Sequence, residues 1–462
     1  MTKKTKPTTT SSTSPQLELF PDAPPAATPA PTPTTPPPTP ATPPPTPAAP
    51  PSENSPAPPA SSAPAKIPPS YVPPPDHPYA HLLDIGEFWT AGQRQANSLH
   101  EVSYRACFKP QLPEYFITRH TKPGDLVYDP FGGRGTTAIE AALHGRRVAT
   151  NDINPLSRIL TEPRLELPPP ALIRARLDAL APLLAQTDAH PLTPDIDLTM
   201  FYEPRTLQHL LALRAYLHER RVTATEDSAD RWLRMVATNR LTGHSPGFFS
   251  VYTLPPNQAA SAKRQIEINR KRAQTPPYRD ILAIIWKKTR NLTSDLTPAQ
   301  TASLRAAARD AQYLNAPAAS TPALASNTVA LTVTSPPFLN IVQYADDNWL
   351  RCWFNRIDTA AVAKRITMST KLAVWDAAMR DVLRELHRVT RPGGHVAFEV
   401  GEVRKGAIRL EETVVPAAEA AGFICQKILI NAQTFTKTAN IWGIDNNASG
   451  TNTNRIVLVQ KP

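Results

Sequence analysis

A short turn in the last third of the chain combines a hydroxyl, two prolines and an aromatic ring. It consists of residues 334–338, Thr-Ser-Pro-Pro-Phe, and follows an apolar run at residues 327–333. The run predicts a buried strand that stops at the prolines, because proline lacks the amide that a ladder needs. A rigid turn with acceptors beside a flat ring suits an extruded nucleobase, stacked on the ring and held by its exocyclic amine. A strand end that is only packed by Phe338 is the alternative.

A glycine-rich turn lies much earlier, between a short strand at residues 125–129 and a helical pattern at residues 138–143. A second strand, residues 147–151, ends at Asp152, which is 20 positions after Gly132. Glycines between a strand and a helix let a cofactor approach the backbone, and an acid after the next strand can hold ribose hydroxyls. The two elements therefore predict a cofactor site.

The glycines and the acid do not by themselves name the cofactor. A nicotinamide or flavin enzyme would meet the same rule, and a glycine turn made only for packing is a further alternative. Asp129, however, stands directly before the glycines, where it would repel a pyrophosphate and attract a cation such as the amino end of S-adenosylmethionine. The glycines also depart from the G-x-G-x-x-G spacing of dinucleotide sites.

Together the two motifs and Asp152 resemble the S-adenosylmethionine-dependent DNA methyltransferases that methylate amino groups, over roughly residues 78–462. Three stretches resemble recurring segments of one subgroup: SYRACFKPQLP, GHSPGFFSVYTLPPN and SGTNTNRIVLVQK. The resemblance implies a Rossmann-like α/β fold with a seven-stranded, mostly parallel sheet and a largely helical insert. It implies catalytic roles for Ser335, Pro336, Pro337 and Phe338. The residues that it implies for binding S-adenosylmethionine are Phe108, Asp129, Pro130, Phe131, Gly132, Gly133, Gly135, Thr136, Asp152 and Asp310.

The first residue of the turn indicates the target. In the family, Ser-Pro-Pro-Tyr or Ser-Pro-Pro-Phe is usual for the N4 amine of cytosine, and Asp or Asn in the first place for the N6 amine of adenine. Ser335 therefore favours cytosine in duplex DNA. Direct transfer needs no covalent enzyme intermediate. The alternatives are N6 methylation of adenine in DNA, base methylation in a structured RNA, and a DNA-binding module without catalysis.

Between the two motifs, from about residue 154 to residue 310, the pattern is mainly helical. Residues 263–290 carry nine Lys or Arg against two acids, a net +7 of the chain's +11. Basic side chains neutralise phosphates and contribute salt-sensitive affinity. A solvated basic helix is the alternative. The residues expected to contact DNA are Lys263, Arg264, Arg270, Lys271 and Arg272, with Asn257, Gln258, His244 and Ser245 as candidates for base contacts.

The first 78 residues hold 28 of the 54 prolines and few large apolar side chains, which predicts a disordered tail. One apolar island in it begins at Gln16 and ends at Phe20, Gln-Leu-Glu-Leu-Phe. This island resembles the pentapeptide by which bacterial DNA enzymes dock on the replication sliding clamp, and a chance cluster is the alternative.

Four segments follow from these patterns: a tail (1–78), a cofactor-binding half (79–160), a target-recognition insert (161–305) and a catalytic half (306–462). Helices are also expected at residues 346–354, 379–389 and 410–421, and strands at residues 395–400, 424–430 and 455–459.

Composition adds expectations about the setting. The three cysteines, Cys107, Cys352 and Cys425, are too far apart for a disulfide framework or a zinc site. No apolar run approaches a membrane span. We therefore expect a bacterial or archaeal cytoplasmic protein at the nucleoid, with duplex DNA as partner, no metal and no membrane contact. A cognate restriction endonuclease is a partner that the resemblance suggests.

Overall fold

The computed structural model describes residues 76–89, 96–105, 107–255, 259–337, 344–366, 371–403, 408–432 and 453–462. All of these belong to one compact unit, residues 62–462. Four features predicted from the sequence lie outside the described residues, namely Phe338, Asn257, Gln258 and the island at residues 16–20. None of the described helices is both long and apolar enough to span a bilayer.

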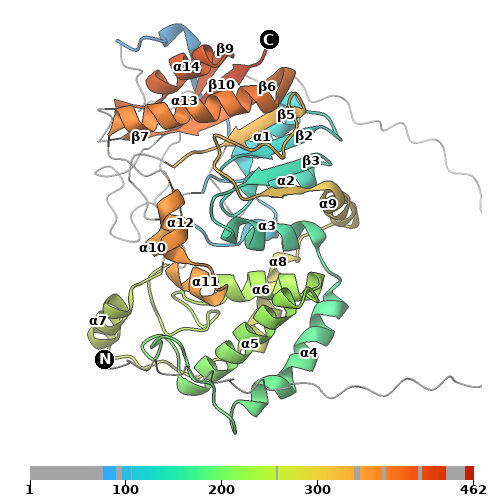
Figure 1. The fold of residues 1–462 in the computed structure, drawn as a ribbon, viewed down its shortest axis with the longest axis vertical. Coiled ribbons are helices and arrows are strands. Elements are labelled where there is room, and N and C mark those ends of the chain that lie inside the picture. Colours follow the sequence, from blue (N-terminus) through green and yellow to red (C-terminus); the bar gives the residue numbers. More distant parts are fainter. Residues whose placement is uncertain are drawn as a thin grey trace, which may run out of the picture. The chain divides into compact units, whose positions relative to one another are not determined.

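The main sheet of the described residues has eight strands in the order β1-β9-β10-β6-β5-β2-β3-β4 (Figure 1). Their bounds are β1 Leu83–Gly86, β2 Leu126–Asp129, β3 Arg147–Asn151, β4 Gln312–Leu314, β5 Val329–Thr334, β6 Thr390–Val400, β9 Ile424–Ala432 and β10 Thr453–Gln460. β10 runs antiparallel to both of its neighbours, and the other neighbouring strands are parallel. The expected α/β fold with a mostly parallel sheet is confirmed, and β1 adds an eighth strand beside β9. β7 (Glu402–Val403) and β8 (Ile408–Arg409) form a separate pair.

The central strands are buried on both sides, which is why they appear as continuous apolar runs in the sequence. All residues of β2 and β5 are buried. Leu126 and Tyr128 point into one hydrophobic core, whereas Val127 belongs to the other. Helices α13 (Leu372–Val389) and α14 (Glu411–Ala420) cover the first face. The opposite face is covered by α1 (Gln111–His120) and α2 (Thr136–Leu143).

The insert is helical, as expected, and it shares a core with the α2 face of the sheet. Trp232 and Leu210 of the insert and Leu331 of β5 belong to the same hydrophobic cluster. The last insert helix packs on α2 and β3, and so returns the chain to the edge strand β4. The helices from β3 to β4 are α3 Leu156–Glu166, α4 Pro170–Gln186, α5 Pro204–Val222, α6 Ser228–Arg240, α7 Ala262–Arg272, α8 Ile281–Leu292 and α9 Pro298–Asp310.

Three short helices follow β5: α10 (Tyr344–Asp347), α11 (Trp349–Phe354) and α12 (Thr359–Arg365). The single helix expected at residues 346–354 is divided at Asn348. Two 3-10 turns, Ala80–Leu82 and Ser98–His100, precede α1.

Parallel pairing brings the two sequence motifs together. β2 pairs with β5 in the register Val127↔Leu331 and Tyr128↔Thr332. Asp129 and the residues after Val333 therefore leave the sheet side by side at its carboxyl edge, where open α/β sheets bind ligands.

Candidate active site

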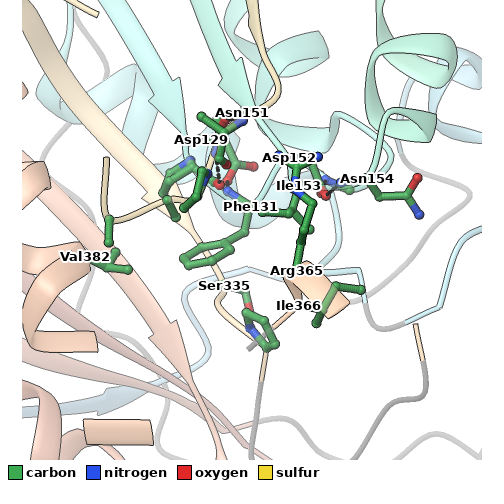
Figure 2. A pocket seen from close by; sticks show the side chains of 18 of the residues that line it. Asp129, Phe131, Asn151, Asp152, Ile153, Asn154, Ser335, Arg365, Ile366 and Val382 are labelled. Carbon is green, nitrogen blue, oxygen red and sulfur yellow. Dashed lines mark hydrogen bonds between the residues drawn. The ribbon is translucent and has the colours of Figure 1, made fainter. Parts of the chain in front are cut away.

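A cavity of about 270 Å³ lies at the carboxyl ends of β2, β3, β4 and β5, and both motifs line it. Figure 2 shows Asp129, Phe131 and Asp152 from the cofactor side and Ser335 from the other motif around this hollow. The predicted residues that line the cavity are Phe108, Asp129, Pro130, Phe131, Gly132, Gly133, Thr136, Asp152, Ser335 and Pro337.

Three predicted residues do not line the cavity. Pro336 is buried within the turn. Gly135 begins α2 with a φ of +77°, and a Cβ there would lie 2.2 Å from Thr161 Oγ1, so this glycine serves the turn and its packing. Asp310 is exposed at the end of α9, before the amino end of β4. Residues 316–319, which follow the carboxyl end of β4, line the cavity instead, so the structure does not support the predicted adenine contact of Asp310.

The glycine turn is held by the acid that follows β3. The amide of Gly133, which has a φ of +51°, donates to Asp152 Oδ2 at 2.8 Å. The other oxygen of Asp152 accepts from the amide of Asn154 at 2.8 Å. Burial raises the pKa of Asp152, and these two hydrogen bonds oppose the rise. Each carboxylate oxygen keeps further acceptor capacity, so Asp152 can also receive ribose hydroxyls.

Asp129 is a buried carboxylate with a direct link to the second motif. Its Oδ1 accepts from the amide of Phe131 at 3.0 Å and from Thr334 Oγ1 at 2.7 Å. Burial raises the pKa of Asp129 to about 6, although the hydrogen bonds from Thr334 and Phe131 lower it. Near neutral pH the group is therefore mostly ionised, in a place where a cationic ligand group would offset its lost hydration.

The Ser-Pro-Pro turn is held from both faces of the sheet. Thr137 Oγ1 of α2 donates to the carbonyl of Val333 at 3.0 Å. Trp375 Nε1 of α13 donates to the carbonyl of Pro337 at 2.8 Å, and the Trp375 side chain is buried. Ser335, between these two anchors, is half-buried and faces the cavity. The backbone on both sides of Ser335 is thus anchored, and Ser335 is still accessible to a ligand.

Several residues of the site carry no prediction from the sequence. Asn151 joins both sides of the cavity floor, since its Nδ2 donates to the carbonyls of Pro130 at 3.1 Å and Ala316 at 2.9 Å. The sequence could have indicated this role, because Asn151 has an amide side chain at the end of a predicted strand and directly precedes Asp152. The other lining residues without a prediction include Tyr104, Cys107, Ile153, Asn154, Arg365, Ile366, Met379 and Val382.

The arginine inside the glycine turn holds the segment that carries Tyr104 and Phe108. Arg134 is 5% exposed, and its Nη1 donates to the carbonyls of Val102 at 2.9 Å and His100 at 3.1 Å. Its Nη2 donates to the carbonyl of Phe108 at 3.4 Å. Arg134 therefore stabilises one wall of the cavity through these hydrogen bonds and does not serve as a ligand contact.

The predicted DNA-contacting residues form the exposed side of α7, and they do not line the cavity. Two of them are engaged within the protein, because Arg264 pairs with Glu267 at 3.0 Å and the Arg272 guanidinium lies 3.8 Å from the centre of the Tyr252 ring. For Lys263, Arg270 and Lys271 the described residues offer no acidic partner. His244 and Ser245 are exposed in the loop after α6.

Comparison with known proteins finds similarity on the cofactor side of the chain. Residues 61–158 match the family model described as DNA methylase. The Type II methyltransferase M.MjaII of Methanocaldococcus jannaschii is 40% identical over 63 residues, which is 14% of this chain and 12% of that protein. The Type II methyltransferase M.MvaI of Kocuria varians is 40% identical over 79 residues, 16% of this chain and 17% of that protein. The chain thus spans less than a quarter of the length of these curated relatives.

Among solved structures, the alignment with the geranyl diphosphate C-methyltransferase of Streptomyces coelicolor A3(2) covers 77% of this chain and 78% of that enzyme's chain. The identity is 6% and the TM-score 0.31, too low for an argument about activity.

Residues 61–158 include Asp129, the glycine turn and Asp152. Over this segment the chain is similar to the DNA methylase family and to these Type II methyltransferases.

Proposed function

We propose that the protein transfers a methyl group from S-adenosylmethionine to the N4 amine of cytosine, at a specific sequence of duplex DNA, with the target base flipped out of the helix. The observation that carries this proposal is that Asp129 and Ser335 line one cavity and are bridged by Thr334. The matched DNA methylase segment supports the cofactor half of the proposal. The serine at the start of the turn supports cytosine over adenine.

The residues present fit the cofactor. The ionised carboxylate of Asp129 would receive its amino group, and Asp152 would accept from its ribose hydroxyls while it still holds Gly133. Phe108 and Phe131 supply apolar walls. When bound, the cofactor supplies an activated methyl group on a sulfonium, and the protein supplies alignment and exclusion of water.

The turn would prepare the amine for attack. The lone pair of the cytosine amine is delocalised into the ring, so the amine is a poor nucleophile until its hydrogens are held out of the ring plane. Ser335 Oγ, which lines the cavity, would accept one of those hydrogens. Pro336 does not line the cavity, so the role of its carbonyl as the second acceptor stays a prediction of the sequence. The carbonyl of Pro337 accepts from Trp375. The cofactor would supply the methyl group, with its methyl–sulfur bond breaking as the new N–C bond forms, and the surplus proton of the amine would pass to solvent after the transfer.

Replacing Ser335 by alanine tests this role. A hydrogen bond that holds the reacting amine is worth about 2 kcal/mol, so turnover should fall by about 10- to 100-fold. Cofactor affinity should change by less than about twofold, because the carboxylates and the glycine turn stay in place. Transfer of labelled methyl groups to duplex DNA measures turnover, and calorimetry measures cofactor affinity.

The matched control is Ser294→Ala, at an exposed serine after α8. This variant should behave as the wild type. Equal losses of turnover and cofactor affinity in Ser335→Ala would show that Ser335 only maintains the cavity, and would count against the proposed reaction. Docking of residues 16–20 on a sliding clamp and pairing with a restriction endonuclease stay predictions of the sequence.

A further inference from the structure

A second hollow, of about 520 Å³, lies beside the cavity, between the end of α5, the start of α3 and the segment that joins α11 to α12. Three arginines line it, Arg221, Arg356 and Arg365, and we call this surface the arginine groove. Arg365 also lines the cofactor cavity, so the two hollows adjoin. Figure 1 shows α11, in orange, beside α6 and above α5, with α12 between α11 and the part of the molecule that holds the sheet.

The positive charge of the groove is only partly neutralised within the described part of the chain, since three arginines face one acid. Arg221 and Arg356 are exposed, and neither side chain has an acidic partner there. Arg365 donates to neutral acceptors, the carbonyl of Asn315 at 3.2 Å and its Oδ1 at 3.4 Å. The acid in the lining, Asp358, is used as the cap of α12, where it accepts from two backbone amides at 2.9 and 3.0 Å.

Other arginines of helices α3 to α6 differ from those of the groove. They are matched with acids, as in the pairs Arg158–Glu162, Arg174–Asp178, Arg205–Asp188, Arg231–Glu166 and Arg234–Glu226. Since the fold pairs most guanidinium groups of this region, the unpaired groups of the groove mark a surface that lacks its counter-charge. A large solvated face would show no such contrast between adjacent arginines.

Two further observations agree with a concentrated positive potential. Arg356, which directly follows the C-cap Asn355 of α11, has a φ of +52°, a conformation that favours glycine and costs other residues about 1–2 kcal/mol. The arginine side chain of Arg356 therefore occupies a position at which the backbone conformation favours glycine. The pKa of His218, which also lines the groove, is lowered by burial and then by the charges of Arg356, Arg234, Arg214 and Arg221.

We propose that the arginine groove binds the phosphate backbone of duplex DNA beside the cavity that receives the flipped base. This inference rests on the proposed function and adds a contact surface distinct from α7. Exposed guanidinium groups hold a small free anion weakly, because water and salt screen the charges. A duplex presents a dense row of phosphates and releases condensed counterions on binding, so the same groups hold it firmly. Such contacts would set the position of the duplex without reading its sequence.

The test is the salt dependence of DNA binding by the full-length protein carrying Arg221→Gln and Arg356→Gln together. Arg365 is left unchanged because it lines the cofactor cavity. Fluorescence anisotropy with a labelled duplex of about 30 base pairs is measured over a range of NaCl concentrations. The slope of log K against log salt should become shallower by about 1.8, because each lost phosphate contact removes about 0.9.

The matched control carries Arg174→Gln and Arg205→Gln, two exposed arginines that already have acidic partners. Its slope should equal that of the wild type. An unchanged slope in the groove variant, or an equal loss in the control, would overturn the assignment. Calorimetry with inorganic phosphate and with S-adenosylmethionine completes the test. Phosphate binding that the groove variant loses would indicate a free-anion site, and lost cofactor affinity would assign the arginines to the cavity, so either result would contradict the proposal.

The outcome can be separated from that of the proposed function. Analysis of the nucleosides made by the wild type decides whether DNA is methylated at all. If methylated bases form and the groove variant keeps the wild-type slope, only the groove assignment fails. If none form, the proposed reaction fails, and the slopes still decide whether the groove binds DNA.

Discussion

Replacing Thr334 by valine should raise the pH at which the protein loses its affinity for S-adenosylmethionine. The hydroxyl of Thr334 donates to Asp129 Oδ1 at 2.7 Å, and Thr334 is fully buried, so water cannot replace the lost donor. Valine keeps the shape of the side chain and removes this bond. The ionised form of Asp129 then loses one of its two donors to Oδ1, the other being the amide of Phe131.

The magnitude follows from the charge on the acceptor. A hydrogen bond to a charged group contributes about 1.5–3 kcal/mol, and 1.36 kcal/mol corresponds to one pKa unit. The pKa of Asp129, about 6 in the wild type, should therefore rise by about one to two units. Loss of a donor disfavours the carboxylate, so the direction is upward. Because the cationic cofactor needs the ionised form, affinity near pH 6.5 should fall by about tenfold, whereas near pH 9 it should approach that of the wild type.

Calorimetric titration with S-adenosylmethionine at several values between about pH 5 and 9 checks this shift. The control is Thr334→Ser, which keeps the hydroxyl and should keep the wild-type pH profile. If Thr334→Val and the wild type show the same dependence of cofactor affinity on pH, the proposed role of the hydrogen bond between Thr334 and Asp129 is refuted. An affinity loss in Thr334→Val that is the same at every pH would also refute it, since that result would show only a packing defect.

Two other predictions concern the supports of the site. Trp375→Phe removes the donor to the Pro337 carbonyl, and turnover should fall by about fivefold, equivalent to about 1 kcal/mol, with cofactor affinity unchanged. Trp353→Phe, at a tryptophan that donates to Asp195 instead, is its control, and equal effects of the two changes would contradict the positioning role. Gly132→Ala would place a Cβ 2.2 Å from Thr150 Oγ1, so the Tm and cofactor affinity should both fall. Adding Thr150→Ala should recover part of each, and a double variant no better than Gly132→Ala would argue against this clash as the cause.

The two turns could be predicted from local sequence, because each contains a combination of residue types that few other local structures need. Gly133 and Gly135 adopt positive φ angles, and Asp152 follows a strand whose last four residues are buried. The prolines after Thr334 end β5 as expected. In each case the signal lies within a few neighbouring residues, where backbone preferences act directly.

The rest of the site depends on contacts between distant segments. Strand β4 has three residues, too few for a periodic signal, and it forms where α9 returns the chain to the edge of β3. Residues 316–319 are three alanines and a proline, which carry no chemical signal, so their place in the cavity follows only from the fold. The same reason explains Asp310, whose carboxylate drew the prediction although it precedes β4 rather than following it.

The hydrogen-bond supports of the turn show the same limit. Thr334 lies in an apolar run and Trp375 lies in a helix, and nothing in the sequence around either residue indicates a special role. Both side chains are buried. Their roles depend on partners, Asp129 and the Pro337 carbonyl, that come from other elements. Arg134 likewise could be taken for a phosphate ligand until its carbonyl partners are known.

The most direct test of the proposed reaction is the composition of DNA from a host without its own DNA methylation, after expression of the full-length protein. The DNA is digested to nucleosides and analysed by mass spectrometry, with the Ser335→Ala variant expressed in parallel. The proposal predicts N4-methylcytosine with the wild type and much less with the variant. N6-methyladenine in its place would contradict the cytosine assignment, and DNA without either modified base would contradict the proposed reaction itself.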